Sequence, residues 1–146
     1  MTYTPARLLT VDDFVAQYAD EAQYELVDGE LIDMEPTGPH ETVGGKIATR
    51  LGIAIAQAQH PWIIPRTCLI RPATDVATAR RPDVVVLNET MLANEPRWQQ
   101  EPVITLAGSV KLVVEVVSTN WETDYARKVE EYAVFGIPEY WIVGAT

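Results

Sequence analysis

The chain has 146 residues, of which 47% are apolar and 22% charged, as is typical of a single globular domain with one core. This composition excludes collagen-like, low-complexity and disulfide-scaffold proteins, and the lone cysteine, Cys68, favours a reducing compartment because it cannot form an internal disulfide. The formal net charge of −10, from 11 Lys and Arg against 21 Asp and Glu, argues against a protein that simply coats nucleic acid.

The chain begins with a predicted helix and a predicted hairpin. Thr10 precedes Val11 and two aspartates, a pattern typical of a helix N-cap and first turn, so we expect a short helix from there to about Ala19. Within residues 23–34, Asp28 and Gly29 separate two short segments in which polar and apolar residues alternate. An Asp-Gly pair in this setting is among the stronger local signals for a β-hairpin.

A longer helix is predicted over residues 40–59. The prolines in residues 36–39 should break the chain before it, and Pro61 should end it because the residue before a proline disfavours helical backbone. Apolar side chains recur at steps of three and four residues and form one face of this helix. They are Val43, Ile47, Leu51, Ala54, Ile55 and Ala58.

The second half of the chain predicts three apolar strands, a helix and a final strand. Two of the strands are short and rich in valine, which suits buried strands, and Gly136 is a typical end for the helix. The expected ranges are 62–70, 83–87 and 112–117 for the three strands, 122–135 for the helix and 140–143 for the last strand. This order predicts one α/β or α+β domain, residues 1–146, around a mixed sheet. Either the last strand completes the domain, or the sequence stops short of its natural C-terminus.

Two carboxylates in the apolar strands are candidates for chemistry. Asp83 follows Pro82 at the start of one valine-rich strand, and Glu115 lies among the valines of another. An ionised carboxylate among valines must be paired, protonated or bound to metal because its desolvation is costly. If the strands are neighbours, both groups could bind one Mg²⁺ or Mn²⁺, as in phosphoryl chemistry. Alternatively, Asp83 caps a turn and Glu115 faces solvent from an edge strand.

Lys128 is a third candidate because it stands at the border of an apolar helical face. That face consists of Tyr125, Val129, Tyr132 and Gly136. A cation near a metal-bound phosphate could orient the attacking water or stabilise developing negative charge. The spacing alone favours a simpler explanation, an i, i+4 ion pair between Lys128 and Asp124 on an exposed helix.

Five strings in a fixed order resemble a known family. They are YELVDGEL at 24–31, His40 at a helix start, RPDVVV at 81–86, LVVEVVS at 112–118, and the segment from Asp124 through Lys128 to GIPEYWIV at 136–143. Together they resemble the Uma family of restriction-endonuclease-like proteins in the PD-(D/E)XK nuclease superfamily, over about residues 10–143. The resemblance implies a restriction-endonuclease-like core of helix, three strands, helix and strand, here preceded by a β-hairpin.

The resemblance also implies roles for single residues. Asp83 and Glu115 match the family's two metal-ligating positions, which would hold Mg²⁺ or Mn²⁺. The superfamily places a lysine two residues after the second ligand, where this chain has Val117. Lys128 matches a lysine that the family has moved to the following helix, so the resemblance makes Lys128 a catalytic residue.

Further positions each have two explanations. Glu25 and His40 match family positions, and Glu25 could add a metal ligand or position water. Alternatively, Glu25 is a cross-strand partner in the hairpin, and His40 caps the helix or fills a polar niche. Arg80 and Arg81 directly precede the Pro-Asp pair and could meet a phosphate, or they could be ordinary solvated surface charges.

The sequence leaves three functions open. The leading one is a metal-dependent endonuclease that hydrolyses the phosphodiester bonds of DNA. The net charge favours two others: a catalytically inactive nuclease-fold interaction module, for example a homodimer, and a metal-dependent hydrolase of small phosphorylated substrates. No apolar run approaches the ~20 residues of a membrane helix, and the N-terminus lacks a signal peptide's apolar core. We therefore expect a cytoplasmic protein without a membrane partner.

Overall fold

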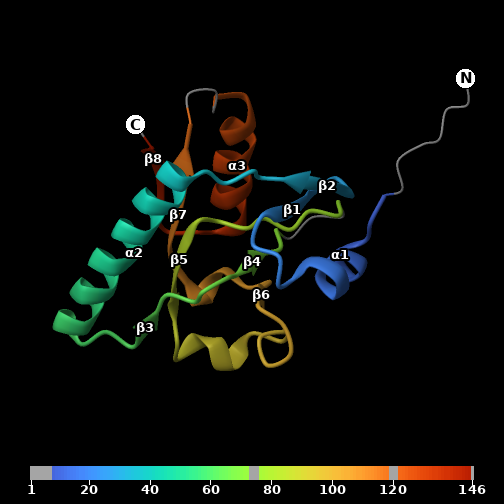
Figure 1. The fold of residues 1–146 in the computed structure, drawn as a ribbon. Helices are drawn as coiled ribbons and strands as arrows, with labels where there is room; N and C mark the ends of the chain where they lie inside the picture. The colour runs from blue at the N-terminus through green and yellow to red at the C-terminus, as the bar shows by residue number, and fades with distance from the viewer. Residues whose placement is uncertain (1–7, 73–75, 119–121, 146) are drawn as a thin grey trace, which may run out of the picture.

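The computed structural model describes residues 8–72, 76–118 and 122–145, with the side chains of 122–124 outside that description (Figure 1). The helices are α1 (Val11–Tyr18), α2 (Gly38–Ala58) and α3 (Glu122–Phe135), with short 3-10 turns η1 (Met91–Asn94) and η2 (Ala107–Ser109). The strands are β1 (Tyr24–Val27), β2 (Glu30–Asp33), β3 (Trp62–Ile63), β4 (Leu69–Ile70), β5 (Val84–Asn88), β6 (Val103–Ile104), β7 (Val110–Val117) and β8 (Tyr140–Gly144). The predicted mixed α+β architecture is confirmed. None of the helices in the described residues is long and apolar enough to span a bilayer.

The central sheet has four strands in the order β3-β5-β7-β8. The strand β5 pairs antiparallel with β3 and β7, whereas β7 pairs parallel with β8, so the sheet is mixed as predicted. The longest strand, β7, lies between two neighbours, and its Glu115 is fully buried. The alternative that Glu115 faces solvent from an edge strand is therefore wrong.

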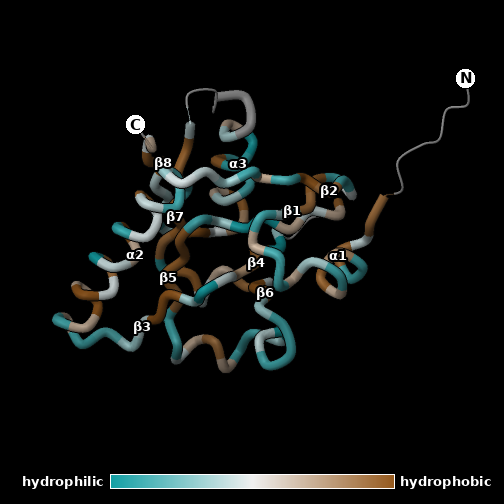
Figure 2. The backbone as a smooth tube through the Cα atoms, viewed as in Figure 1, coloured by the Kyte–Doolittle hydropathy of each residue, from teal (hydrophilic) through white to brown (hydrophobic). Residues whose placement is uncertain are grey.

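The helices α2 and α3 cover opposite faces of this sheet. Against α2, Ile47, Leu51 and Ile55 pack on Val84, Val86, Leu112 and Val114. Against α3, Tyr132 packs in a cluster that includes Val85, Leu87, Val110 and Val113. Both faces of β5 and β7 are buried as a result, which explains their near-continuous valine content and the hydrophobic colour along β5 in Figure 2.

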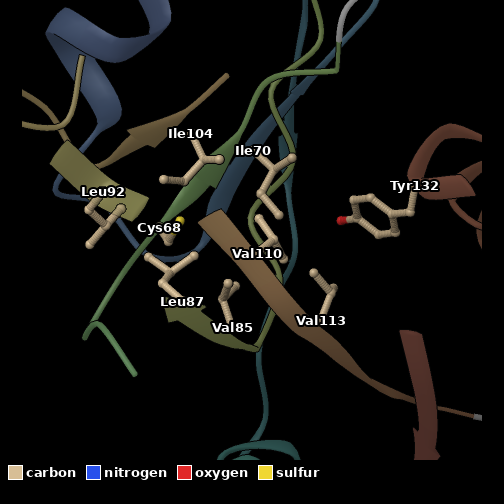
Figure 3. Close-up of a cluster of buried hydrophobic side chains, with 9 residues drawn as sticks. All are labelled: Cys68, Ile70, Val85, Leu87, Leu92, Ile104, Val110, Val113 and Tyr132. Atoms are coloured by element: carbon tan, nitrogen blue, oxygen red, sulfur yellow. The ribbon is translucent and has the colours of Figure 1, made fainter. Parts of the chain in front are cut away.

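The cluster beneath α3 contains the lone cysteine. Figure 3 shows Cys68 among the aliphatic side chains, with Tyr132 reaching in from α3. Burial raises the pKa of the Cys68 thiol to about 12. Because the thiolate is the reactive form of cysteine, Cys68 is a packing residue and not a nucleophile.

The N-terminal elements confirm the local signals. Thr10 and Asp13 form a reciprocal capping box at the start of α1. Asp28 and Gly29 both adopt positive φ angles, 51° and 81°, between β1 and β2. Two central residues with positive φ are what the tightest hairpin turns require.

The long helix α2 starts earlier than predicted. Thr37, not His40, caps it by accepting a hydrogen bond from the backbone N–H of His40 at 3.3 Å. Pro39 lies inside the first turn, where its missing N–H is not needed, so it does not break the chain. The predicted apolar face is also too wide, because Ala54 and Ala58 are exposed.

The predicted strand 62–70 is wrong as a single strand. Its two ends form β3 and β4 in different sheets, because Pro65 cannot donate to a strand ladder and the chain changes direction there. The strand β4 pairs in parallel with β6, a two-residue strand that the sequence did not predict. Two residues carry too little alternation to be recognised as a strand.

Candidate active site

The pairing of β5 with β7 brings the two candidate carboxylates together. Val84 pairs with Val114, so the same antiparallel register continued by one residue sets Asp83 opposite Glu115. Side chains directly opposite each other in such a pair lie on the same face of the sheet. The condition for a shared metal site, that these two strands are neighbours in the sheet, is therefore met.

Asp83 is held by contacts that reach across the fold. Its Oδ2 accepts a hydrogen bond from the backbone N–H of Val116 at 2.6 Å, and its Oδ1 accepts one from Nε2 of His40 at 2.7 Å. These contacts come from β7 and from the first turn of α2, not from a local turn that Asp83 would cap. Asp83 and His40 keep side-chain exposures of 24% and 21%, so both can meet solvent.

Glu115 is a buried carboxylate with one unsatisfied oxygen. Tyr132 donates a hydrogen bond to Oε1 at 3.1 Å, whereas Oε2 has no hydrogen-bond partner among the described residues. Burial raises the pKa of Glu115 to about 8, against the opposing effect of the nearby Lys128 charge. Buried polar atoms almost always have partners, so Oε2 marks a place for a proton or a cation.

Lys128 lies inside the protein, with a side chain only 2% exposed. Its Nζ stands 3.5 Å from Oε1 of Glu25 and 3.6 Å from Oε1 of Glu115. The explanation as an ion pair on an exposed helix face is therefore wrong, although the Asp124 side chain itself lies outside the described residues. The predicted apolar face of α3 is wrong at Val129, which is 45% exposed.

Glu25 and Arg80 form the other side of this cluster. Glu25 is the register partner of Ile32 in the hairpin, but its side chain is buried and accepts from Arg80 Nη1 at 3.0 Å and from the backbone N–H of Arg81 at 3.2 Å. Arg80 also donates twice to Glu131 at 2.9 Å. Its guanidinium is thus shared between two carboxylates and is not a solvated surface charge.

Arg81 is also buried, but it points away from this cluster. Its guanidinium donates to the backbone carbonyl groups of Tyr18, Ala19 and Tyr24. It therefore joins the end of α1 to the start of β1. Arg81 is not a solvated surface charge, because its donors bind protein carbonyl groups. It is also not placed to meet a phosphate in the cavity described below, because it does not line that cavity.

We expect the substitution Arg81→Met to destabilise the fold without removing a site residue. The carbonyl groups that Arg81 satisfies would lose a charged donor, which should lower the free energy of unfolding by about 2–4 kcal/mol. Urea denaturation measures this loss, with Arg66→Met as the control because Arg66 is exposed. Equal midpoints for the two variants would contradict the structural role of Arg81.

A cavity of about 520 Å³ opens beside the cluster. Its polar lining includes Glu25, His40, Arg80, Arg127 and Lys128. Its apolar wall comes largely from the hairpin, with Val27, Ile32 and Met34. Asp83 and Glu115 are not part of the lining, but each contacts a side chain that is.

The donor set suits a hard divalent cation. Among the described residues, no three His, Cys, Asp or Glu side chains are gathered as a complete metal centre. Mg²⁺, however, is usually held by one or two carboxylates and completes its coordination with waters and substrate phosphates. Asp83 and Glu115 offer two carboxylates, one with an oxygen that lacks a partner. These residues therefore fit Mg²⁺ or Mn²⁺.

Three contributors to the site, Tyr132, Glu131 and the cavity-lining Arg127, were not found from the sequence. Tyr132 was assigned to the apolar face, yet its hydroxyl binds Glu115. Its position four residues after Lys128 could have indicated that the two side chains share one face of the helix. Glu131 carries no comparable signal, because it binds Arg80 from a position 51 residues away in the chain.

Comparisons with known proteins agree with this architecture. The family model described as Uma2, putative restriction endonuclease, matches residues 11–145. A crystal structure of a putative nuclease belonging to DUF820 from Anabaena variabilis has a TM-score of 0.63 at 14% sequence identity, covering 93% of this chain and 74% of that chain. At this identity the likeness shows the fold alone. The search of curated proteins gives no match.

Proposed function

Because this chain belongs to the Uma2 family of putative restriction endonucleases, we propose that it hydrolyses phosphodiester bonds of DNA as a metal-dependent endonuclease. The observation that carries the proposal is the buried Glu115, set opposite Asp83 and beside Lys128, with one oxygen that has no partner in the described residues. A buried carboxylate with an open acceptor destabilises a fold unless a proton, a charged partner or a metal ion satisfies that acceptor.

Each residue of the cluster has a separate task in this proposal. Asp83 and Glu115 hold Mg²⁺ or Mn²⁺, which when bound polarises the scissile phosphate and acidifies a water. Lys128 orients the attacking water or stabilises negative charge that develops on the phosphate. Glu25 fixes the Lys128 ammonium, and Arg80 in turn fixes Glu25.

His40 positions Asp83, and its replacement by glutamine tests that role. We expect His40→Gln to lower the Mn²⁺ affinity about 10- to 100-fold, as loss of a residue that orients a metal ligand typically does. The melting temperature should change little because both side chains are partly exposed. The control is His60→Gln, just beyond the C-terminal end of α2. Equal Mn²⁺ affinities for the two variants would contradict the role.

Calorimetric titration of Mn²⁺ tests the proposed site directly. The wild-type protein should bind Mn²⁺, and Glu115→Gln should lose that binding because the amide removes the anionic ligand. Glu95→Gln is the matched control, since Glu95 is another buried carboxylate and its partners, Thr105 and Leu106, do not belong to the cluster. If wild type fails to bind Mn²⁺, the site is not a metal site.

The same titration bears on the two other functions. An inactive interaction module, including a homodimer, predicts no Mn²⁺ binding and no cleavage. A hydrolase of small phosphorylated molecules is favoured by the acidic net charge of −10 and predicts that a small phosphate ester, but not plasmid DNA, is hydrolysed in Mn²⁺. Plasmid cleavage that requires Mn²⁺ supports the endonuclease against both.

A further inference from the structure

Among the described residues, three cationic side chains line the cavity, and they differ in their access to solvent. Arg80 is 4% exposed and Lys128 is 2% exposed, and both are held by buried carboxylates. The side chain of Arg127, by contrast, is 46% exposed. Of these three cations, Arg127 is therefore the most accessible to a ligand that arrives from solvent.

Arg127 already holds an acidic group in the geometry that suits a phosphate. Its Nη1 and Nη2 donate to the two carboxylate oxygens of Asp28 at 2.7 and 2.6 Å. Parallel hydrogen bonds of this kind are how a guanidinium binds either a carboxylate or a phosphate. The remaining donor, Nε, binds Glu131 at 2.7 Å and fixes the direction of the guanidinium.

The contact between Arg127 and Asp28 should open easily. The Asp28 side chain is 50% exposed, and exposed ion pairs contribute little to stability. The hydrogen bond from Arg127 lowers the pKa of Asp28, so the ionised carboxylate is the form that Arg127 favours. A backbone phosphate that enters the cavity offers the same two acceptor oxygens, so it can replace Asp28 at little cost.

We propose that Arg127 binds a phosphate group of the nucleic acid backbone, and that Asp28 occupies its guanidinium until the substrate displaces it. This inference rests on the proposed function and names the phosphate-binding residue of the same site. It places the phosphate contact on Arg127 and not on Arg80 or Arg81, whose donors are engaged with buried partners. The tip of the hairpin is thereby a built-in competitor for the substrate.

Two variants of this ion pair should change DNA binding in opposite directions. Asp28→Asn removes the competitor and preserves the turn, because asparagine readily adopts the positive φ of 51° found at position 28. It should tighten binding of a fluorescein-labelled DNA duplex about two- to fivefold, the range of an exposed ion pair. Arg127→Gln should weaken binding about tenfold and reduce the slope of log K against log salt by about 0.9.

Fluorescence anisotropy in EDTA measures these affinities without metal-dependent cleavage. Asp12→Asn and Arg97→Gln are the controls, because they alter a second ion pair, between an exposed Asp12 and a partly buried Arg97, with the same changes in net charge. Where binding is too weak to measure, the KM for plasmid cleavage in Mn²⁺ replaces the affinity.

The outcomes separate this inference from the proposed function. The phosphate-binding role is supported if Asp28→Asn raises and Arg127→Gln lowers the affinity for the duplex, each by more than its control variant does. Weaker DNA binding in both variants, or changes in affinity equal to those of the controls, would overturn the role. Plasmid cleavage in Mn²⁺ would still support the endonuclease function in that case. If the wild type neither binds the duplex nor cuts plasmid in Mn²⁺, both ideas fail.

Discussion

Asp83→Asn is expected to lower Mn²⁺-dependent cleavage of supercoiled plasmid by a factor of about 10³ or more. The substitution removes the negative charge that the metal requires, and loss of a direct ligand should exceed the 10- to 100-fold effect typical of residues behind the ligands. The fold should survive, because the amide oxygen can still accept from the backbone N–H of Val116 and the amide nitrogen can still bind His40.

The measurement is the initial rate of plasmid nicking, together with thermal unfolding of the same sample. Asp20→Asn is the control because Asp20 is exposed on the chain that follows α1. A variant purified in the same way also controls for contaminating nucleases. If Asp83→Asn cleaves at the wild-type rate, Asp83 is not a metal ligand and the proposed mechanism is wrong.

Lys128→Met should affect both cleavage and stability. Loss of a group that stabilises charge in the transition state typically lowers kcat by about 10²–10³. Removing one partner of a buried ion pair leaves uncompensated charge, so the free energy of unfolding should also fall, by about 3 kcal/mol. Lys46→Met is the matched control, since Lys46 is exposed on α2.

A second substitution separates these two effects of Lys128. Adding Glu25→Gln to Lys128→Met removes a carboxylate that the lysine had balanced at 3.5 Å. Stability should recover in part, measured as the urea midpoint, whereas kcat should not. If the double variant regains cleavage along with stability, Lys128 serves only to balance buried charge and has no part in the chemistry.

Several features of the protein were predictable from short stretches of sequence. The capping box of α1, the Asp28-Gly29 turn and the end of α3 at Gly136 are confirmed. Each depends on residues within about four positions of one another, where backbone preference and local hydrogen bonds dominate. The valine content of β5 and β7 likewise indicated strands buried on both faces, and it made Glu115 stand out as an ionisable group in a costly place.

The arrangement of the charged residues could not be predicted in this way. Spacing on the helix favoured an exposed Lys128, whereas the packing of α3 on the sheet buries it between carboxylates from β1 and β7. Arg80 and Arg81 are adjacent in sequence, yet one lines the cavity and the other ties α1 to β1. Their partners lie tens of residues away, so no local pattern distinguishes them.

Sequence alone therefore identified the candidate residues: the carboxylates at 83 and 115 and, through the family resemblance, the lysine at 128. Tertiary structure alone decided which of them meet, which are buried and which cation remains accessible. The contact between Asp28 and Arg127 spans 99 positions and exists only because the hairpin packs beside α3. Local preferences act over a few residues, but burial and charge pairing depend on the whole packed chain, and these set the energies on which function depends.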